Sequence, residues 1–131
     1  MRYVETRGAR LSVIGLGTWQ FGSREWGYGA GYASGEAIEI VRRAVELGIN
    51  LIDTAEIYGF GRSERIVGRA IRGLRPHVFV ATKVFPVLPL APVVAHRGRA
   101  SAARLGIKPI DLYQVHWPNP VVPLSTTMHG I

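Results

Sequence analysis

Four residues whose side chains can hold or transfer a proton stand at or just after the ends of short apolar runs: Asp53, Tyr58, Lys83 and His116. Three of them follow an apolar run directly, and the tyrosine lies five residues after the aspartate in a turn punctuated by glycine. Buried parallel strands read as continuous apolar runs, and in barrels built from such strands the carboxyl ends carry the chemistry. If these strands are parallel neighbours, a carboxylate, a phenol, an ammonium and an imidazole converge on one edge of the sheet.

Each of the four also has an ordinary structural explanation when it is taken alone. An aspartate after a strand commonly serves as a turn residue or a helix cap. A tyrosine in a glycine-rich turn commonly packs against the protein, a lysine at a strand end can be a plain surface charge, and a histidine can be buried and hydrogen-bonded. The functional prediction therefore depends on the joint placement of all four residues.

The elements that must position these residues alternate between strands and helices. A hairpin is predicted from residues 2–5 and 11–13, which flank the turn Arg7-Gly8-Ala9. The other apolar runs predict four strands, at residues 13–17, 51–53, 78–83 and 111–116.

Helices are predicted in the three intervals between these strands. Ser34 is expected to cap the first helix, with Glu36 in its first turn and Gly48 just past its end. Ser63 is expected to cap the second helix, and Gly73 to close it. Before the first helix, residues 21–33 are rich in glycine and aromatic residues, and they predict a long loop that lines a pocket or packs on itself.

Pro92 suits the first position of the third helix. After the last strand, the tail that begins at residue 117 shows no helical pattern. The residues expected on the buried faces of the three helices are Ile38, Val41, Ala44 and Val45, then Ile66, Val67, Ala70 and Ile71, and then Val94, Ala95, Ala102 and Leu105.

Four strands with three intervening helices predict an α/β protein with a parallel sheet, preceded by a short amino-terminal β-hairpin. A closed eight-stranded (β/α)8 barrel of the TIM type takes roughly 250 residues. The 131 residues of this chain supply about half of that, and they stop in a loop after the fourth strand. We therefore predict the first half of such a barrel.

Composition excludes several other classes of protein. No cysteine is present, which excludes thiol nucleophiles and cysteine zinc sites and fits a reducing, cytoplasmic location. The longest apolar run, residues 84–95, is interrupted by three prolines and is too short to span a bilayer. Gln20 stands where a dinucleotide-binding glycine motif beginning at Gly15 needs its third glycine, and no phosphate-binding loop motif occurs.

The net charge of +7 comes from 14 arginines and 2 lysines against 9 acids. Because the arginines are spread along the chain, we interpret those at 65, 69 and 72 as a solvated outer helix face and expect no nucleic-acid partner. His77, His96 and His129 lack metal-ligand spacing, so we expect them at the surface and predict no metal site.

The chain resembles the aldo-keto reductase family in four segments that occur in the family's order. Each segment is a weak signal by itself, but the four together are specific, and the resemblance covers nearly the whole chain. The matching segments are Gly15-Leu16-Gly17-Thr18-Trp19, residues 53–59 with Ser63-Glu64, Ala81-Thr82-Lys83, and residues 111–118.

The resemblance implies a (β/α)8 barrel that reduces aldehydes and ketones with NADPH, with a catalytic tetrad at Asp53, Tyr58, Lys83 and His116. Reduction of a carbonyl needs a hydride, which the cofactor supplies, and a proton, which a phenol can supply. An ammonium such as that of Lys83 favours the phenolate that remains, the aspartate would hold the lysine, and the histidine would orient the substrate oxygen. The residues expected near the nicotinamide are Gly17, Thr18, Trp19 and Asp53.

The resemblance also implies that the carboxy-terminal half of the family's barrel is absent, so that residues 1–131 form a partial domain with strands 1–4. The expected partners are a small carbonyl substrate and, through open sheet edges, further copies of the chain. The chain alone is expected to be inactive. The alternative is a non-catalytic half-barrel that associates with another chain.

Overall fold

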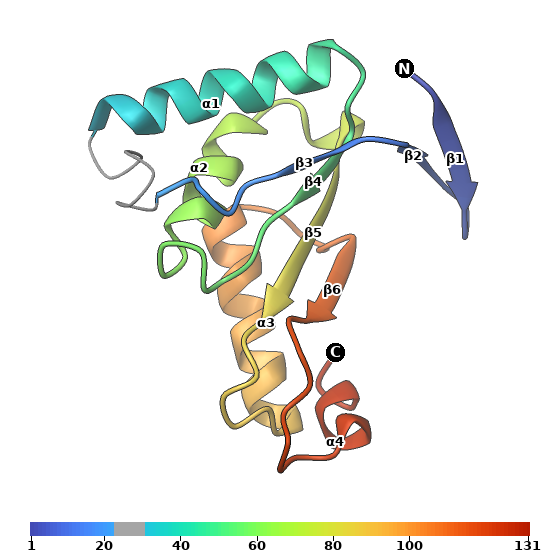
Figure 1. Cartoon of the computed structure of the whole chain (residues 1–131), viewed down its shortest axis with the longest axis vertical. Coiled ribbons are helices and arrows are strands. Elements are labelled where there is room, and N and C mark those ends of the chain that lie inside the picture. Colours follow the sequence, from blue (N-terminus) through green and yellow to red (C-terminus); the bar gives the residue numbers. More distant parts are fainter. Residues whose placement is uncertain (23–30) are drawn as a thin grey trace.

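A four-stranded parallel sheet with helices on one face forms the body of the computed structural model (Figure 1). The structure describes residues 1–22 and 31–131, and only the backbone of residues 31–33. The elements in chain order are β1 (Tyr3–Thr6), β2 (Ala9–Ser12), β3 (Gly15–Gly17), α1 (Gly31–Glu46), β4 (Leu51–Asp53), α2 (Arg62–Ala70), the 3-10 helix η2 (Arg75–His77), β5 (Phe79–Val84), α3 (Ala91–Leu105), β6 (Leu112–Val115) and α4 (Leu124–Met128).

The strands of the main sheet lie in the order β3-β4-β5-β6, so that each strand pairs with the strand next in the sequence. All three pairings are parallel, with Gly17 opposite Asp53, Asp53 opposite Ala81, and Lys83 opposite Gln114. This is the α/β architecture of a first half-barrel that the alternating pattern predicted, so that prediction is confirmed. The carboxyl ends of β3, β4, β5 and β6 therefore lie along one edge of the sheet.

The predicted hairpin is present as the antiparallel pair β1 and β2. Its two-residue turn places Arg7 at φ 45° and Gly8 at φ 79°, the left-handed backbone that the commonest hairpin turns require. Ser12 and Asn50 exchange two hydrogen bonds, because the Asn50 side chain accepts from the Ser12 amide at 2.7 Å and the Ser12 hydroxyl accepts from the Asn50 amide at 3.0 Å. These bonds hold the hairpin against Asn50, the residue directly before β4.

Both serine caps predicted from the sequence are wrong. Helix α1 begins at Gly31, so Ser34 lies within its first turn and Glu36 lies beyond it. Gly61 occupies the cap position of α2, with φ at 79° and no side-chain hydrogen bond, while Ser63 lies inside the helix and is fully buried. A serine near a helix start satisfies the usual capping pattern, but the local sequence does not reveal the tertiary partners that claim its hydroxyl.

The carboxy-terminal elements agree with the sequence except in the tail. Pro92 is the second residue of α3, one position later than predicted, and Gly106 ends the helix in the left-handed conformation. The tail contains the short helix α4, which the sequence pattern did not predict because only five residues form it. The histidines expected at the surface are all exposed: His77, His96 and His129. Of the loop predicted over 21–33, residues 31–33 are helical, and Trp26 and Tyr28 lie outside the described residues.

The core lies between the sheet and helices α1 to α3. Ile52 of β4 and Val80 of β5 point into it and are fully buried, because alternate residues of each strand face the helices. The opposite sheet face carries no helix in the described part of the chain (Figure 1). No helix within residues 1–22 and 31–131 is long and apolar enough to cross a membrane. The predicted inward residues that are buried include Val41, Ala44, Ile66, Val67, Ala70, Ile71, Val94 and Leu105, while Ile38, Val45, Ala95 and Ala102 are partly buried.

Gly68 allows α2 and α3 to approach closely, and this contact gives a testable prediction. A Cβ added at Gly68 would lie 2.5 Å from the backbone oxygen of Leu105, which cannot move like a flexible side chain. We expect Gly68→Ala to lower the free energy of unfolding by about 1–3 kcal/mol, since overpacking outweighs the gain of roughly 1 kcal/mol in helix propensity. Urea unfolding followed by circular dichroism measures the change.

The matched control is Gly35→Ala in α1, where the added Cβ meets no described atom within 4 Å. Only the propensity term acts there, so this variant should be stabilised by up to about 1 kcal/mol. Equal stability changes in the two variants would contradict the close approach of the helices.

Candidate active site

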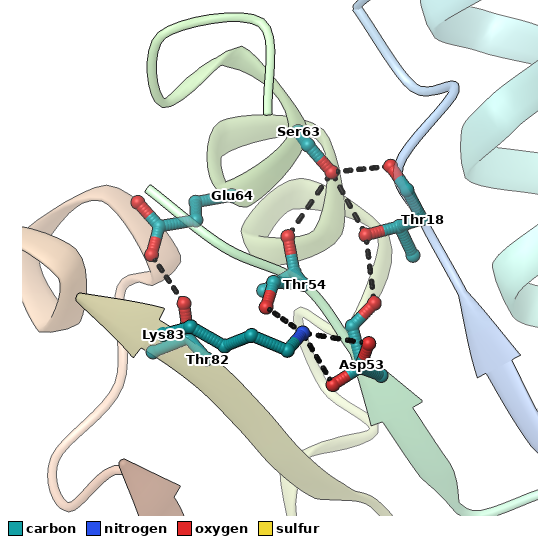
Figure 2. A network of polar contacts seen from close by, with 7 residues as sticks. All are labelled: Thr18, Asp53, Thr54, Ser63, Glu64, Thr82 and Lys83. Carbon is teal, nitrogen blue, oxygen red and sulfur yellow. Dashed lines mark hydrogen bonds and ion pairs between the residues drawn. The ribbon is translucent and has the colours of Figure 1, made fainter. Parts of the chain in front are cut away.

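The ammonium of Lys83 lies between the ends of β4 and β5. Its Nζ donates to both carboxylate oxygens of Asp53 at 2.7 Å and to the backbone oxygen of Thr54 at 2.9 Å (Figure 2). The lysine side chain is 14% exposed and the aspartate side chain 40%, so the pair is shielded on one side only. Three oxygen acceptors therefore fix the position of a charge that still borders solvent.

The strand register explains why these two residues meet. Asp53 lies opposite Ala81, and Lys83 is two residues further along β5, hence on the same face of the sheet. That face is the one without helices, and the lysine stem runs along it toward the end of β4. The sequence places a carboxylate as the last residue of one strand and an ammonium near the end of the next, which is sufficient to form the pair.

Tyr58 is held near Lys83 by a tight turn after β4. The backbone amide of Tyr58 donates to the carbonyl of Ala55 at 3.1 Å, and three successive residues then take positive φ: Gly59 at 56°, Phe60 at 53° and Gly61 at 79°. Phenylalanine rarely adopts this conformation, so its neighbours must impose it. The Lys83 Nζ lies 5.3 Å from the centroid of the Tyr58 ring.

His116 follows β6 and completes the group. Its ring lies edge-on to that of Tyr58, with centroids 5.6 Å apart, and 4.5 Å from the ring of Trp117. Its Nδ1 is buried without a hydrogen-bond partner in the described part of the chain. Burial, and secondly the charge of Lys83, lower the pKa of His116 below its ordinary value of 6.5. The imidazole is therefore neutral at neutral pH.

A network of hydroxyl groups beneath Asp53 joins α2 to the strand ends (Figure 2). The Ser63 hydroxyl bonds to the Thr18 hydroxyl and carbonyl, each at 2.8 Å, and to the Thr54 hydroxyl at 3.1 Å. The Thr18 hydroxyl in turn donates to the carbonyl of Asp53 at 3.1 Å. All three hydroxyl residues are fully buried, so the network holds the backbone that carries the aspartate.

A buried ionic group supports the strand that carries Lys83. Glu64 of α2 is fully buried and accepts from the Thr82 hydroxyl at 2.7 Å and from the Arg104 guanidinium. Thr82 directly precedes Lys83 and points to the helix side of the sheet, where Figure 2 shows it bonded to Glu64. A buried charge needs such a partner, so Arg104 of α3 is tied to the same point.

A second glutamate ties the turn of Tyr58 to the segment after β5. Glu56 accepts from the backbone amide of Phe85 and pairs with Arg97 of α3. The Glu56 side chain is only 10% exposed, so its carboxylate bonds to these protein groups and has little contact with water. The loop of Tyr58 is thus held to the end of the strand that carries Lys83.

The residues predicted to contact the nicotinamide differ in accessibility. Gly17 is exposed, and no atom of the described residues lies within 4 Å of the Cβ it lacks, so the backbone there leaves room for a flat ligand. Trp19 is 61% exposed. Thr18 is fully buried with its hydroxyl bonded to protein groups, so it contributes to holding Asp53.

The structure brings together the four residues predicted for catalysis, and it adds others that sequence reasoning missed: Thr54, Ser63, Glu64 and Thr82. A signal for part of this set is present in the sequence, because threonines 18, 54 and 82 each adjoin a predicted site residue at a strand end. Within the described ranges, no group of three acidic or histidine residues could hold a metal ion.

Comparison with known proteins covers both sequence and structure. The family model described as Aldo/keto reductase family matches residues 13–131. An uncharacterized oxidoreductase of Mycobacterium tuberculosis is 58% identical over 132 residues, which span 100% of this chain and 41% of that protein. The aldo-keto reductase YhdN of Bacillus subtilis is 45% identical over 92% of this chain and 38% of its own length.

Among solved structures, an aldo-keto reductase from Klebsiella pneumoniae in complex with NADPH superposes with a TM-score of 0.82 and 34% identity. The superposition covers 94% of this chain and 41% of that one. The chain therefore spans about two fifths of the length of the proteins it matches.

The lowered pKa of His116 gives a prediction for the dependence of stability on pH. Between the folded-state value and 6.5 the unfolded chain binds the proton more readily, so this histidine's contribution is complete above pH 6.5 and is lost as the pH falls. A nuclear magnetic resonance titration of the folded chain should give a midpoint for His116 below 6.5.

Urea unfolding between neutral and mildly acidic pH provides the matching measurement. His116→Gln should flatten the decline in stability through that window, since glutamine does not titrate. A midpoint at or above 6.5, or an unchanged decline in the variant, would contradict the burial of the ring.

Proposed function

The chain belongs to the aldo/keto reductase family, and we propose that it carries the proton-donating site of an NADPH-dependent oxidoreductase that reduces an aldehyde or ketone to an alcohol. The observation that supports this most strongly is the position of the Lys83 ammonium. It is held by Asp53 and lies beside the ring of Tyr58 at the carboxyl edge of the sheet.

Tyr58 is the proposed proton donor. As the carbonyl oxygen takes up the proton, negative charge appears on the phenol oxygen, and the nearby ammonium stabilises that charge. Asp53 holds the lysine ammonium in place, because both oxygens of its carboxylate accept hydrogen bonds from Nζ. The two residues thus act on the tyrosine, and the tyrosine acts on the substrate.

His116 is proposed to orient the substrate oxygen. Its lowered pKa keeps the ring neutral at neutral pH, so it carries one N–H donor and does not compete with Tyr58 as a strong acid. The edge-on contact with the tyrosine ring supports this role, because it keeps the imidazole next to the proposed proton donor. A hydrogen bond from the imidazole would hold the carbonyl oxygen toward the phenol.

NADPH is the proposed cofactor, and when bound it would supply the hydride. The residues proposed to hold the nicotinamide are Gly17, Trp19 and Asp53, with Thr18 acting from beneath through its bond to the Asp53 carbonyl. The open backbone at Gly17 supports this assignment, because a side chain there would occupy the space beside the strand ends. Solved relatives of similar fold contain NADP or NADPH.

The 131 residues are proposed to be one partial barrel domain, strands 1–4, within a larger functional unit located in the cytoplasm. The rest of the unit would supply the remaining cofactor contacts and part of the pocket for a small carbonyl substrate. The share of length covered in the relatives supports this proposal.

The test is Tyr58→Phe in a full-length protein that carries this segment. We expect kcat to fall by roughly 10²–10⁴-fold, the usual contribution of a general acid, while the NADPH dissociation constant stays the same. Stopped-flow turnover and fluorescence titration of NADPH measure the two quantities.

Tyr113→Phe provides the control, because it removes a buried hydroxyl on the helix side of β6 that has no hydrogen-bond partner in the described part of the chain. Its turnover should match that of the unmodified protein. Parallel losses of turnover and cofactor binding in Tyr58→Phe would show that the tyrosine has another role.

The alternative is a non-catalytic half-barrel that associates with another chain or copy. Strands β3 and β6 are the outer strands of the sheet and offer unpaired backbone groups, and Leu112 on the face without helices is 42% exposed. In a closed barrel, side chains from the opposing strands would fill that space.

For the purified 131-residue chain we expect either self-association or a weakly stable monomer, with no measurable NADPH-dependent reduction of an aldehyde. Unpaired edges and an unfilled sheet face both favour association. Sedimentation velocity and an aldehyde assay decide the matter. A cooperative 14.4 kDa monomer that oxidises NADPH at an enzyme-like rate would overturn this expectation.

A further inference from the structure

We infer that a second ligand site lies on the outer side of helices α2 and α3, where a groove lined by arginines binds a small ligand with two or more phosphate groups. The groove has a volume of about 850 Å³. No residue of the tetrad lines it. The six arginines that do, here called the arginine groove, are Arg62, Arg65, Arg69, Arg72, Arg75 and Arg104.

Two of these arginines are paired with an acidic residue, and within residues 1–22 and 31–131 the other four are not. Arg104 is paired with buried Glu64, and Arg75 with Asp111. The other four belong to α2 and the turn after it, at spacings of three and four residues, and therefore project from one helix face. Among the described residues none of these four has an acidic partner, and no acidic residue lines the groove.

The arginines of α2 occupy positions that are electrostatically unfavourable when no anion is bound. Arg62 and Arg65 lie in the first turn of α2, where the helix dipole opposes positive charge. Like charges three or four residues apart on a helix also repel one another. The dipole accounts for Arg69 in the last turn. Glu64 is the acid of the first turn, but its carboxylate is fully buried and already paired with Arg104, so it does not pair with Arg62 or Arg65. A bound anion would relieve both effects.

The chemistry of the lining selects the ligand. Guanidinium groups match phosphate with paired N–H donors, and all six cations of the groove are arginine. Single-stranded nucleic acid is usually held by aromatic stacking as well, and among the described residues no aromatic side chain lines the groove. The volume falls in the range of small-molecule pockets, roughly 300–1,000 Å³. These features favour a compact polyphosphate ligand.

Calorimetric titration of inorganic triphosphate into the purified chain tests the site. We expect binding to the unmodified chain, and at least roughly tenfold weaker binding after Arg65→Gln with Arg69→Gln, because charge-assisted hydrogen bonds are lost. Inorganic monophosphate should bind more weakly than triphosphate. Both substituted side chains are exposed, and circular dichroism verifies that the helices persist.

The control pairs Arg2→Gln with Arg7→Gln, two exposed hairpin residues that change the net charge equally. Its triphosphate affinity should be unchanged. Equal losses in both double variants, or no binding at all, would overturn the proposal. If a single-stranded oligonucleotide or anionic vesicles bind more tightly than triphosphate, the proposal of a small ligand is wrong, and the groove binds a nucleic acid or a membrane instead. None of these readouts depends on reductase activity.

Discussion

The bond between Lys83 and Asp53 depends on two strands being parallel, adjacent and in one particular register. A shift of one residue between β4 and β5 would turn the lysine to the helix side of the sheet, where Thr82 now bonds to Glu64. Two interactions on opposite faces of β5 therefore fix the same register. This register determines where Lys83 and Asp53 lie. The hydroxyl network under Asp53, and the hydrogen bond from the Phe85 amide to Glu56, then hold the loops around that pair.

The sequence predicted the order and type of the main elements because their signals are local and periodic. Apolar runs marked the four parallel strands, and buried stripes marked the faces of α1 to α3. It predicted two serine caps, Ser34 and Ser63, and both of these predictions are wrong. Ser63 carries the expected capping pattern, yet its oxygen bonds to Thr18, a residue 45 positions away. Such a bond depends on the completed sheet and leaves no trace in neighbouring residues.

The candidate site also contains residues that the sequence predicts and residues that it does not. Asp53, Lys83 and His116 were predictable because a charged or polar residue ending an apolar strand is conspicuous, and parallel strands gather their ends. The buried residues that support the site were less visible, since a threonine or glutamate beside a strand is usually interpreted as a solvent-exposed residue. Their role became apparent only when Glu64 proved to be fully buried, because a carboxylate in that environment requires partners.

The sequential strand order has a consequence for how the protein assembles. Every pairing in the main sheet joins strands that are neighbours along the chain, so no strand waits for a distant segment before it can dock. Each pairing joins residues 28 to 36 positions apart, and loop-closure entropy grows with that separation, so pairing neighbouring strands costs less than pairing the first strand with the last would. The sheet can therefore grow one strand at a time as the polypeptide leaves the ribosome, with each βα unit serving as the template for the next.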